Sequence, residues 1–463
     1  MRDRWLYAWG LGSVAFGGAS LLVPLYIVEL GATPVQLGIL AATAAIIGAP
    51  GAILFGRLAN RVEHRRMLVV LTLAGVSVSL AVIPLLPNIT TIILANAVLW
   101  LVVASVGPVL TMLVVDEAPE SAWSERIGLL NKYQGYGWAG GLVLGAVWPL
   151  VATPLVGGAS VTRALFWVLA LCAGASTLGT IRSLPNPAPE DHVTSERRIR
   201  RVARLLSSSR RGVKGATFAF SPNRLYWTTQ GIHPRRLVGR VNPALATYLI
   251  AAALFFTGFA AFWAPLPLFF TDVGFVSGQV FALYLASSLG AAVLYEGAGR
   301  IASKYDVRLL QSGALAVRGL LFPVVGIVTG LGALAVGLVA AGVGLAAIGL
   351  TWAFIAVVGT AIVTRLAPPG VRGEVLGVHT ALSAVAGGVG GILGGWAATF
   401  GYLVAFGVAG GLVIVGGVLV FSLRTLSGGE RAAQPPTDPV VATADGLGVP
   451  AVSTDEVPEM RHD

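Results

Sequence analysis

The chain carries about twelve apolar runs of roughly 20 residues or more, and this pattern limits its fold more than any other feature. A run of that length forms a helix about 30 Å long, which matches the hydrocarbon thickness of a bilayer. Reading the runs against proline, glycine and charged residues predicts spans at about 5–29, 35–56, 67–87, 89–114, 128–151, 161–182, 244–270, 277–298, 309–329, 331–362, 375–397 and 400–423. We therefore expect an all-α polytopic membrane protein with about twelve transmembrane helices.

The composition argues against several other classes of protein. Hydrophobic residues make up 56% of the 463 residues and charged residues 11%, whereas a soluble domain carries about 25% charged residues. The single cysteine excludes disulfide bonds within the chain and thiolate metal clusters. The five histidines are scattered, and no paired acidic motif lies within the spans. We therefore expect no enzymatic activity, no metal site and no cofactor.

The net charge of +10 comes from cations that lie between the spans, which is the pattern of membrane orientation and not of nucleic-acid binding. The cations on one side include Arg57, Arg61, Arg65, Arg66, Arg126, Arg300, Lys304, Arg308, Arg372 and a cluster in the long central loop. The short loops on the opposite side carry few cations, with Arg163 as the exception. The positive-inside rule predicts a multi-pass protein of the cytoplasmic (plasma) membrane with both termini in the cytoplasm.

The sequence repeats itself. Residues 24–40 align without a gap on residues 267–283, and Gly56 and Arg57 then align with Gly299 and Arg300. A later pair of segments aligns with a slightly different offset, so that Gly141 and Gly145 meet Gly390 and Gly394. An even number of spans in each copy predicts two six-helix bundles related by a pseudo-two-fold axis along the membrane normal.

This repeat divides the chain into four parts. We expect bundles at 1–183 and 243–426, a basic cytoplasmic linker at 184–242 and a disordered tail at 427–463. Within the linker, "ERRIRRVARLLSSSRR" places apolar residues at helical spacing between arginines. The stretch is either an amphipathic helix on the anionic inner leaflet or a solvated linker that fixes topology.

The loop after the second span, "GRLANRVEHR", resembles a motif of the major facilitator superfamily, G-x-L-a-D-r-x-G-r-[kr]-x-x-l. Gly56, Leu58, Ala59, Arg61, Arg65 and Leu68 match it. The chain departs from the motif at Asn60, where the family has Asp, and at Glu63, where the family has its second Gly. The resemblance covers about residues 5–424 and implies a secondary transporter that works by alternating access.

The resemblance further implies that this loop and its second copy latch one state of the transporter. The latch residues would be Gly56, Arg57, Asn60, Arg61, Glu63, Arg65, Gly299, Arg300, Lys304, Asp306 and Arg308. Glu63 and its counterpart Asp306 supply a carboxylate near the position where the family has Asp. The alternative is that the cations serve only to orient the protein in the membrane.

Ionisable residues inside a span are costly, so each one should have a partner or a role. Lys132 on the fifth span, with Asn131 and Gln134, forms a polar cluster that we expect to bind substrate. The alternative for Lys132 is that it extends to the cytoplasmic interface. Arg318 on the ninth span is expected to pair with Glu296 on the eighth, either as a structural pair or as a proton-coupling site.

The resembling family lines its cavity with helices one, four, seven and ten. Phe259, Trp263, Trp100 and Trp352 lie on such helices and would wall the cavity, although aromatic residues at this spacing also occur in ordinary packing. His379 near the start of span eleven reads as an interfacial histidine. Glu29 and Asp272 end spans one and seven, where we expect each to cap the following helix or, alternatively, to gate the exit.

These features favour a secondary transporter of a small organic molecule, with efflux of an apolar or cationic compound favoured because the expected cavity has aromatic walls and few buried polar groups. Proton antiport is not implied, because "GGLVLGAVWP" lacks the G-P pair that the family's antiporters carry near the end of helix five. The alternatives are a symporter that takes up a sugar or an organic anion and a membrane receptor that does not transport. We expect a small-molecule substrate, with or without a coupling ion, membrane lipids as partners, no nucleic acid, and a monomer.

Overall fold

The computed structural model of the chain describes residues 4–61, 65–116, 123–157, 160–184, 242–302, 304–330, 333–367 and 372–432. These residues form long helices joined by short turns. Ten helices in the described ranges are long and apolar enough to span a bilayer, and two more begin with shorter apolar stretches. The described part of the chain is therefore an all-α, multi-pass membrane protein, as the apolar runs predict.

Six helices form the first half of the molecule. They are α1 (Arg4–Glu29), α2 (Pro34–Arg61), α3 (Arg65–Val82, followed by a 3-10 turn at Ile83–Leu85), α4 (Ile89–Asp116), α5 (Trp123–Val156) and α6 (Val161–Ser183). Each helix covers all or most of one predicted span; α3 and its 3-10 turn end at Leu85, just before the predicted end at 87. Helices α2 and α5 extend a turn or more beyond the predicted ends, because a helix that emerges from the hydrocarbon no longer needs apolar residues.

The second half repeats this order. Its helices are α10 (Pro243–Trp263), α11 (Leu266–Val273), α12 (Ser277–Ala302), α13 (Val307–Thr329), α14 (Leu334–Leu366), α15 (Arg372–Ala397, followed by a 3-10 turn at Ala398–Phe400) and α16 (Tyr402–Ala432). Helix α16 continues to Ala432, past the point where the sequence predicts a disordered tail. The tail is predicted from the loss of apolar residues, which does not by itself end a helix in water.

The seventh span is interrupted, although the sequence predicts one continuous helix at 244–270. Helix α10 ends at Trp263 and α11 starts at Leu266, with Pro265 and Pro267 at the break. Neither proline has an N–H to donate to the helix. In the first half, α1 contains only Pro24 and stays continuous. The aligned proline, Pro267, is therefore tolerated in this fold, and the additional Pro265 accounts for the interruption.

Residues that align in the sequence repeat make the same turns in both halves. Gly31 and Gly274 both have positive φ, at 83° and 104°, which a glycine adopts without strain. After each turn a glutamine side chain caps the next helix: Gln36 Oε1 accepts from the Thr33 N–H at 2.9 Å, and Gln279 Oε1 accepts from the Val276 N–H at 3.1 Å. The repeat is thus a repeat of local structure as well as of sequence.

The two halves also pack in the same way. Helix α1 packs against α5 and α6, and its counterpart α10 packs against α15 and α16. Glycines allow the closest of these approaches: a Cβ on Gly141 would lie 2.3 Å from the Val14 carbonyl oxygen, and a Cβ on Gly390 would lie 2.2 Å from that of Thr257. Such backbone contact between helices requires small residues. The architecture is therefore two equivalent six-helix bundles.

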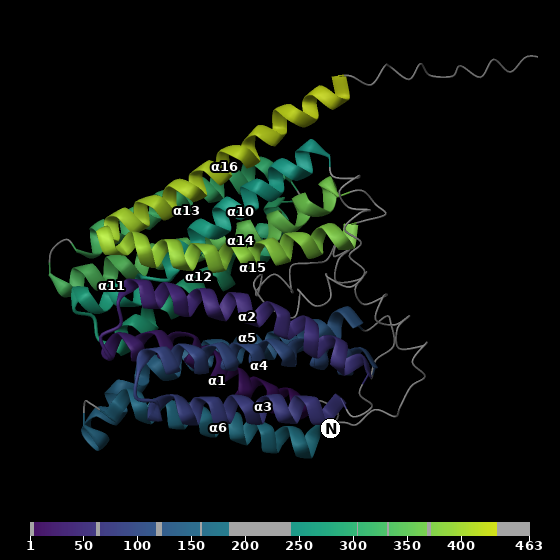
Figure 1. Cartoon of the computed structure of the whole chain (residues 1–463). Coiled ribbons are helices and arrows are strands. Elements are labelled where there is room, and N and C mark those ends of the chain that lie inside the picture. The colour runs from purple at the N-terminus through teal and green to yellow at the C-terminus, as the bar shows by residue number, and fades with distance from the viewer. Residues whose placement is uncertain are drawn as a thin grey trace, which may run out of the picture.

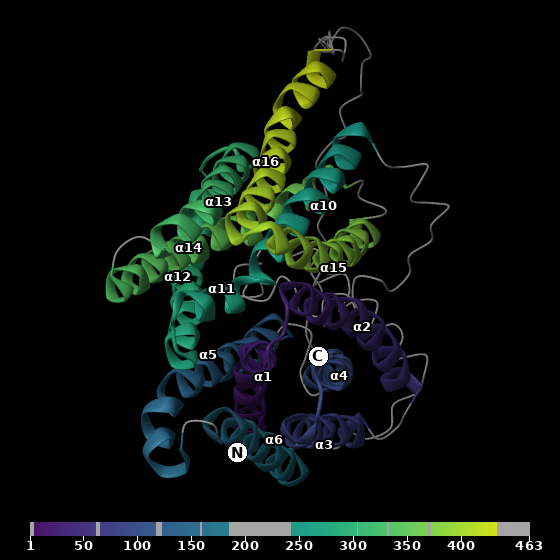
Figure 2. The same cartoon turned by 60° about the vertical axis from the view of Figure 1, so that its left-hand side comes forward.

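The halves meet along two helix pairs, α2 with α15 and α5 with α12 (Figure 2). Gly38 lies against the backbone of Gly391 and Gly395, where a Cβ on Gly38 would come within 2.5 Å of the Gly391 carbonyl oxygen. Gly145 of α5 lies against the ring of Phe281 of α12. Exchanging the halves turns one pair into the other, which is the pseudo-two-fold symmetry that the repeat predicts.

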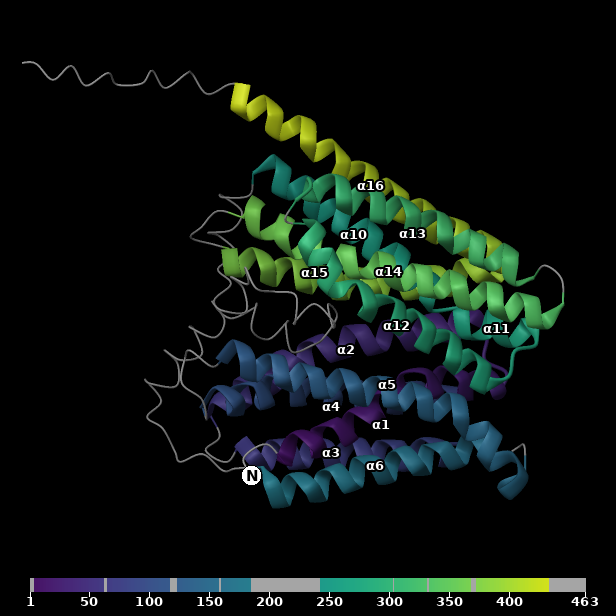
Figure 3. The same cartoon turned by 180° about the vertical axis from the view of Figure 1, so that it is seen from behind.

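Figures 1 and 3 show the first half, in purple and blue, beside the second half, in green and yellow. We use two names for the ends of this bundle. The linker end is the end where α6 finishes at Ser183 and α10 begins at Pro243; the far end is the end where α1 finishes at Glu29 and α12 begins at Ser277. Helices of each half run from one end to the other, as spans must.

Candidate functional site

Arg318 of α13 is a charged side chain in the interior of the second half, only 3% exposed. Its Nη1 donates to the Ile348 carbonyl oxygen at 2.8 Å and to the Thr351 hydroxyl at 3.2 Å, both on α14. A planar guanidinium suits such a position, because it offers several N–H groups in a fixed arrangement and is weakly hydrated. Arg318 thus joins α13 to α14 through polar contacts.

Aromatic rings surround the same guanidinium. Its Cζ lies 4.4 Å from the centroid of Phe259 and 5.6 Å from those of Phe322 and Trp352. The negative face of an aromatic ring attracts a cation, and the attraction grows as water is removed. We call Arg318, Phe259, Phe322 and Trp352 the arginine cage. It joins three helices, α10, α13 and α14.

The cage brings together three residues that the sequence singles out for different reasons. Arg318 is expected to form an ion pair, and Phe259 and Trp352 are expected to wall a cavity. The predicted partner of Arg318, Glu296, belongs to α12, but its side chain lies outside the described residues, so the pair remains a prediction. Phe322 and Thr351 were not expected; the position of Thr351 next to Trp352 is the only signal in the sequence.

Trp263, at the end of α10, is one of the three predicted cavity aromatics of the second half and contacts other residues. Its ring contacts Phe262 at 5.5 Å and Tyr284 of α12 at 5.1 Å between centroids. In the first half, Trp100 of α4 faces Trp138 of α5 with centroids 6.4 Å apart. The structure therefore places Trp263 and Trp100 in contacts that do not involve the arginine cage.

A second polar group lies nearer the linker end of the second half. The hydroxyl of Tyr248 in α10 contacts the side-chain amide of Gln311 in α13 at 3.0–3.2 Å and donates to the Gly359 carbonyl oxygen at 3.3 Å. His379 of α15 stacks on the Tyr248 ring, with centroids 6.0 Å apart. The sequence marked His379 as interfacial and did not identify Gln311, although an amide within a span is itself a signal of a polar contact.

The polar cluster predicted on α5 is divided between faces of the helix. Gln134 lies on the side of Gly137 and Gly141, which pack against α1. Asn131 is two turns before Trp138, the residue that meets Trp100 of α4. Lys132 lies on a third face, on a stripe with Val143 and Leu150, both exposed. The structure therefore separates Lys132, itself exposed, from the two amides.

The Lys132 ammonium has an aromatic neighbour on its own helix. Its Nζ lies 5.6 Å from the ring centroid of Tyr136, which is 67% exposed. A lysine over an exposed tyrosine on an otherwise apolar stripe is typical of the boundary between hydrocarbon and head groups. This environment favours the interfacial interpretation of Lys132.

The acids at the far end accept hydrogen bonds from hydroxyl groups. Thr162 at the start of α6 donates to Glu29 at 2.6 Å, and Tyr402 at the start of α16 donates to Asp272 in the equivalent position of the second half. Glutamine side chains cap the starts of the following helices, whereas these acids contact hydroxyl groups at the starts of other helices. Glu29 also accepts from Ser277 of the other half at 3.3 Å.

The predicted latch is only partly described. Gly56, Arg57, Asn60, Arg61, Arg65 and Gly299 lie in helices whose side chains at these positions are outside the described residues, as is all of Glu63. In the second copy, Asp306 caps α13 by accepting from the Arg308 N–H at 2.9 Å. The Arg308 Nη1 donates to the Leu423 carbonyl oxygen of α16 at 2.8 Å. Arg300 and Lys304 are exposed at the linker end.

The chain matches a known family. A model of the Major Facilitator Superfamily matches residues 8–356, which is more than half of the chain. No curated protein matches the chain. Among solved structures, the nucleoside transporter NupG superposes with a TM-score of 0.62 at 13% identity, covering 92% of this chain and 98% of that chain. A point mutant of NupG gives 0.68 at 12% identity, covering 91% and 99%. At these identities the likeness shows the fold alone.

Proposed function

Because the chain belongs to the major facilitator superfamily and is a membrane transporter of a small molecule, we propose that it performs secondary active transport by alternating access, with efflux as its direction. The two equivalent bundles support this mechanism. Halves that contact each other along a few helix pairs can rock about a site between them. The linker end is then the cytoplasmic end, since the cations of the predicted loops lie there.

The arginine cage is the observation that carries the proposed substrate site. Phe259 and Trp352 come from α10 and α14, two helices that the family places around its cavity, and Trp352 is partly exposed. The Arg318 guanidinium lies 4.4 Å from the centroid of the Phe259 ring and 5.6 Å from that of the Trp352 ring. Phe259 is buried, at 2% exposed, so it is the partly exposed Trp352 ring that offers a rigid surface on which an aromatic or apolar compound can stack. The nearby guanidinium disfavours a cationic compound by charge repulsion.

Contacts at the two ends of the bundle provide the proposed gates. At the far end, the hydrogen bond between Ser277 and Glu29 joins the two halves. At the linker end we assign the latch to the two motif copies, where Arg308 already ties α13 to α16. Transport requires that one set of contacts is made while the other is broken.

Uptake of a sugar or an organic anion is the second candidate, and the cation of the cage favours it. A carboxylate or hydroxyl group near Arg318 would gain a charge-assisted hydrogen bond, and Asn131 and Gln134 supply further donors and acceptors on α5. The nucleoside transporters that share this fold carry a polar substrate by their printed name. A ring-bearing polar substrate would combine stacking on Trp352 with these polar contacts.

Flux through the purified protein tests the proposal. The full chain is reconstituted in liposomes, and a panel of labelled apolar aromatic compounds, organic anions and sugars is followed with and without a pH gradient or a membrane potential. Efflux predicts movement of an aromatic compound towards the face opposite the linker end, driven by the gradient. Concentrative movement of a sugar or anion in the other direction would favour the second candidate, and saturable binding without flux would indicate a receptor.

Orientation is tested with the chain's one cysteine, Cys172. In a Cys172→Ser background, a new cysteine at Ser183 or at Leu30 is treated with a membrane-impermeant thiol reagent in intact cells. The proposal predicts that Leu30→Cys reacts and that Ser183→Cys reacts only after the membrane is opened. The reverse result would contradict both the assigned orientation and the direction of transport.

A further inference from the structure

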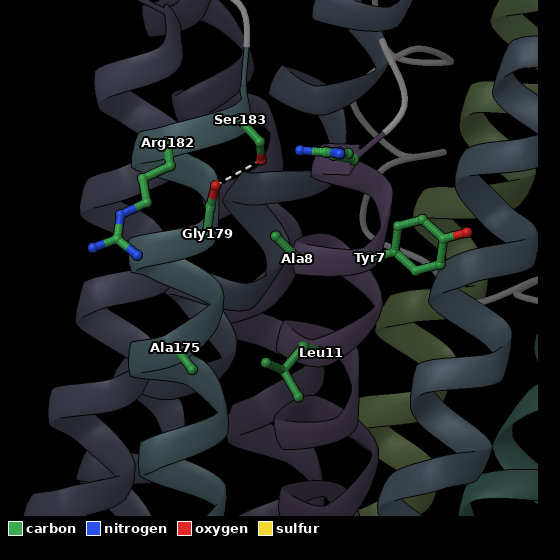
Figure 4. Close-up of a pocket in the computed structure, with 8 residues that line it drawn as sticks. Tyr7, Ala8, Leu11, Ala175, Gly179, Arg182 and Ser183 are labelled. Carbon is green, nitrogen blue, oxygen red and sulfur yellow. Dashed lines mark hydrogen bonds between the residues drawn. The ribbon is translucent and has the colours of Figure 1, made fainter. Parts of the chain in front are cut away.

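A groove lies between α1 and α6 at the linker end, away from the arginine cage. Its volume is about 590 Å³, and it is lined by residues that include Arg4, Tyr7 and Leu11 of α1 and Ala175, Arg182 and Ser183 of α6. Figure 4 shows Leu11 and Ala175 beside the gap between the two helices, with Tyr7 and Arg182 on the outer sides of α1 and α6. The groove therefore has a small, apolar floor and polar groups at its rim.

The groove opens towards the surroundings of the molecule. Tyr7 is 67% exposed, and the α6 residues Leu171, Leu178 and Ile181 are 72%, 57% and 43% exposed. Exposed apolar residues in such number on a transmembrane helix face lipid, because there they lie against hydrocarbon and not water. The position of Tyr7 at the end of the span is typical of the aromatic belt at the membrane interface.

Along the groove the residues change from charged to aromatic to apolar, in the same order as the head group, the interfacial region and the acyl chains of a phospholipid. Arg4 lies at the start of α1, Tyr7 follows one turn deeper, and Leu11 lies about 10 Å below Arg4. Arginine at the rim can bind a phosphate through paired hydrogen bonds, and the apolar floor can receive an acyl chain. On the adjacent helix α5, the exposed Lys132 lies next to Tyr133, whose ring contacts Tyr7.

We propose that this groove binds one anionic phospholipid of the inner leaflet, with its phosphate between Arg4 and Arg182 and an acyl chain over Leu11 and Ala175. Charge decides the occupant. The arginine-rich stretch of the chain's own linker, residues 197–211, carries the same sign as the groove and is repelled by it. An anionic head group carries the opposite sign, and lipid surrounds the site.

Lipid titration of the full chain tests the proposal. Native mass spectrometry follows the binding of phosphatidylglycerol and of phosphatidylcholine to the protein in detergent. Each cation near an anionic lipid surface contributes a factor of about five to affinity, so the double variant Arg4→Gln/Arg182→Gln should bind phosphatidylglycerol about 25-fold more weakly. Binding of phosphatidylcholine should change less than twofold.

Two further variants separate this site from general charge effects. The pair Arg163→Gln/Arg365→Gln removes the same charge from exposed positions outside the groove and should leave phosphatidylglycerol binding within twofold of wild type. Ala175→Leu fills the groove and keeps both arginines; it should weaken phosphatidylglycerol binding at least fivefold. This second variant tests the groove even where the arginine variant folds poorly.

Three results would overturn the proposal. The first is equal phosphatidylglycerol binding by wild type and by both groove variants. The second is an equal loss in the control pair, which would mean that overall charge and not the groove holds the lipid. The third is displacement of the lipid by millimolar inorganic phosphate with the same dependence on Arg4 and Arg182, which would make this a site for a free anion.

Discussion

Arg318 in α13 and Gly75 in α3 occupy the same position in the two halves. In the first half, Gly75 lies against Val102 of α4, where a Cβ would come 3.3 Å from the valine methyl group. In the second half, Arg318 reaches the Ile348 carbonyl and the Thr351 hydroxyl of α14. The same helix packing is thus built once around a glycine and once around a cation.

The rings of the cage differ between the halves in the same way. Phe259 has a counterpart in Phe16 of α1, but the position of Phe322 is held by Ser79 in α3. Both versions fold into the same helix pattern, so the bundle does not require the cation or the additional ring. A buried charge is costly, so Arg318 is expected to have a specific role, and our proposal assigns that role to a substrate site in the second half.

Loss of the cation should give the largest effect. Arg318→Met removes three ring contacts and two hydrogen bonds, and it leaves the predicted partner Glu296 without a cation; a broken buried pair costs about 3–5 kcal/mol of unfolding free energy. Thermal unfolding in detergent should show the loss, and flux should fall at least tenfold. Glu296→Gln should cost a similar amount.

The double variant Glu296→Gln/Arg318→Met checks the pair itself. If the two groups interact, the double variant should be more stable than the sum of the single losses predicts. Strict additivity would mean that Arg318 is held by its ring and α14 contacts alone. In the first half, Gly75→Ala should cost less than about 1 kcal/mol, because a valine methyl can move by a few tenths of an ångström.

The shared part of the two halves should respond equally. Gly141→Ala and Gly390→Ala each push a methyl group into a helix backbone, which should cost about 1–3 kcal/mol of unfolding free energy in both cases. Gly387→Ala is the matched control, since no atom lies within 4 Å of its Cβ position; it should leave stability unchanged or raise it by about 0.5–1 kcal/mol. A large effect at only one of the first two glycines would break the equivalence.

Variants of the two acids at the far end should distinguish a contact between the halves from a contact within one half. Glu29→Gln weakens the hydrogen bond to Ser277 of the other half, at about 1 kcal/mol, and should shift the equilibrium between transport states about fivefold. A spin-label distance across the far end would report the shift. Asp272→Asn affects only the bond to Tyr402 in its own half and should lower stability without a shift; equal shifts in both variants would contradict this assignment.

Lys132→Met should have the smallest effect on transport. The side chain lies on the exposed stripe of α5, so flux should stay within twofold of wild type and unfolding within about 0.5 kcal/mol. Asn131→Ala, one residue earlier on the face of Trp138, should reduce flux more. A large loss of flux in Lys132→Met alone would contradict the interfacial interpretation and support a role for Lys132 in substrate binding.

The sequence was sufficient for the spans and for the two bundles, because membrane insertion forces long apolar runs and the repeat preserves Gly31 and Gly274 at the same turns. It did not reveal the interruption at Pro265. One proline in a membrane helix is tolerated, as Pro24 shows in α1, and the effect of a second one depends on how the surrounding helices satisfy the backbone.

The candidate site was harder to predict for a physical reason. Which residues meet across helices depends on helix rotation and tilt, which single apolar runs do not encode. The sequence therefore singles out Arg318 and Phe259 for separate reasons and does not predict their contact with each other or with Phe322 and Thr351. The face of α5 that carries Lys132 can be predicted from the sequence, because a spacing of 3.6 residues per turn puts Lys132 in line with Val143 and Leu150. The prediction of a substrate-binding cluster rests on the polarity of the "NKYQ" stretch and does not take this spacing into account.

The contact of Gly38 with Gly391 and Gly395 has a mechanical consequence. Backbones that touch at glycines have only small groups between them at this point, so the contact can act as a fulcrum. The arm from Gly38 to the end of α2 at Arg61 is about 34 Å long. If the halves rock as proposed, a tilt of about 15° around this point would move the end of the helix by about 9 Å, so a small rotation at the far end would give a larger displacement at the linker end.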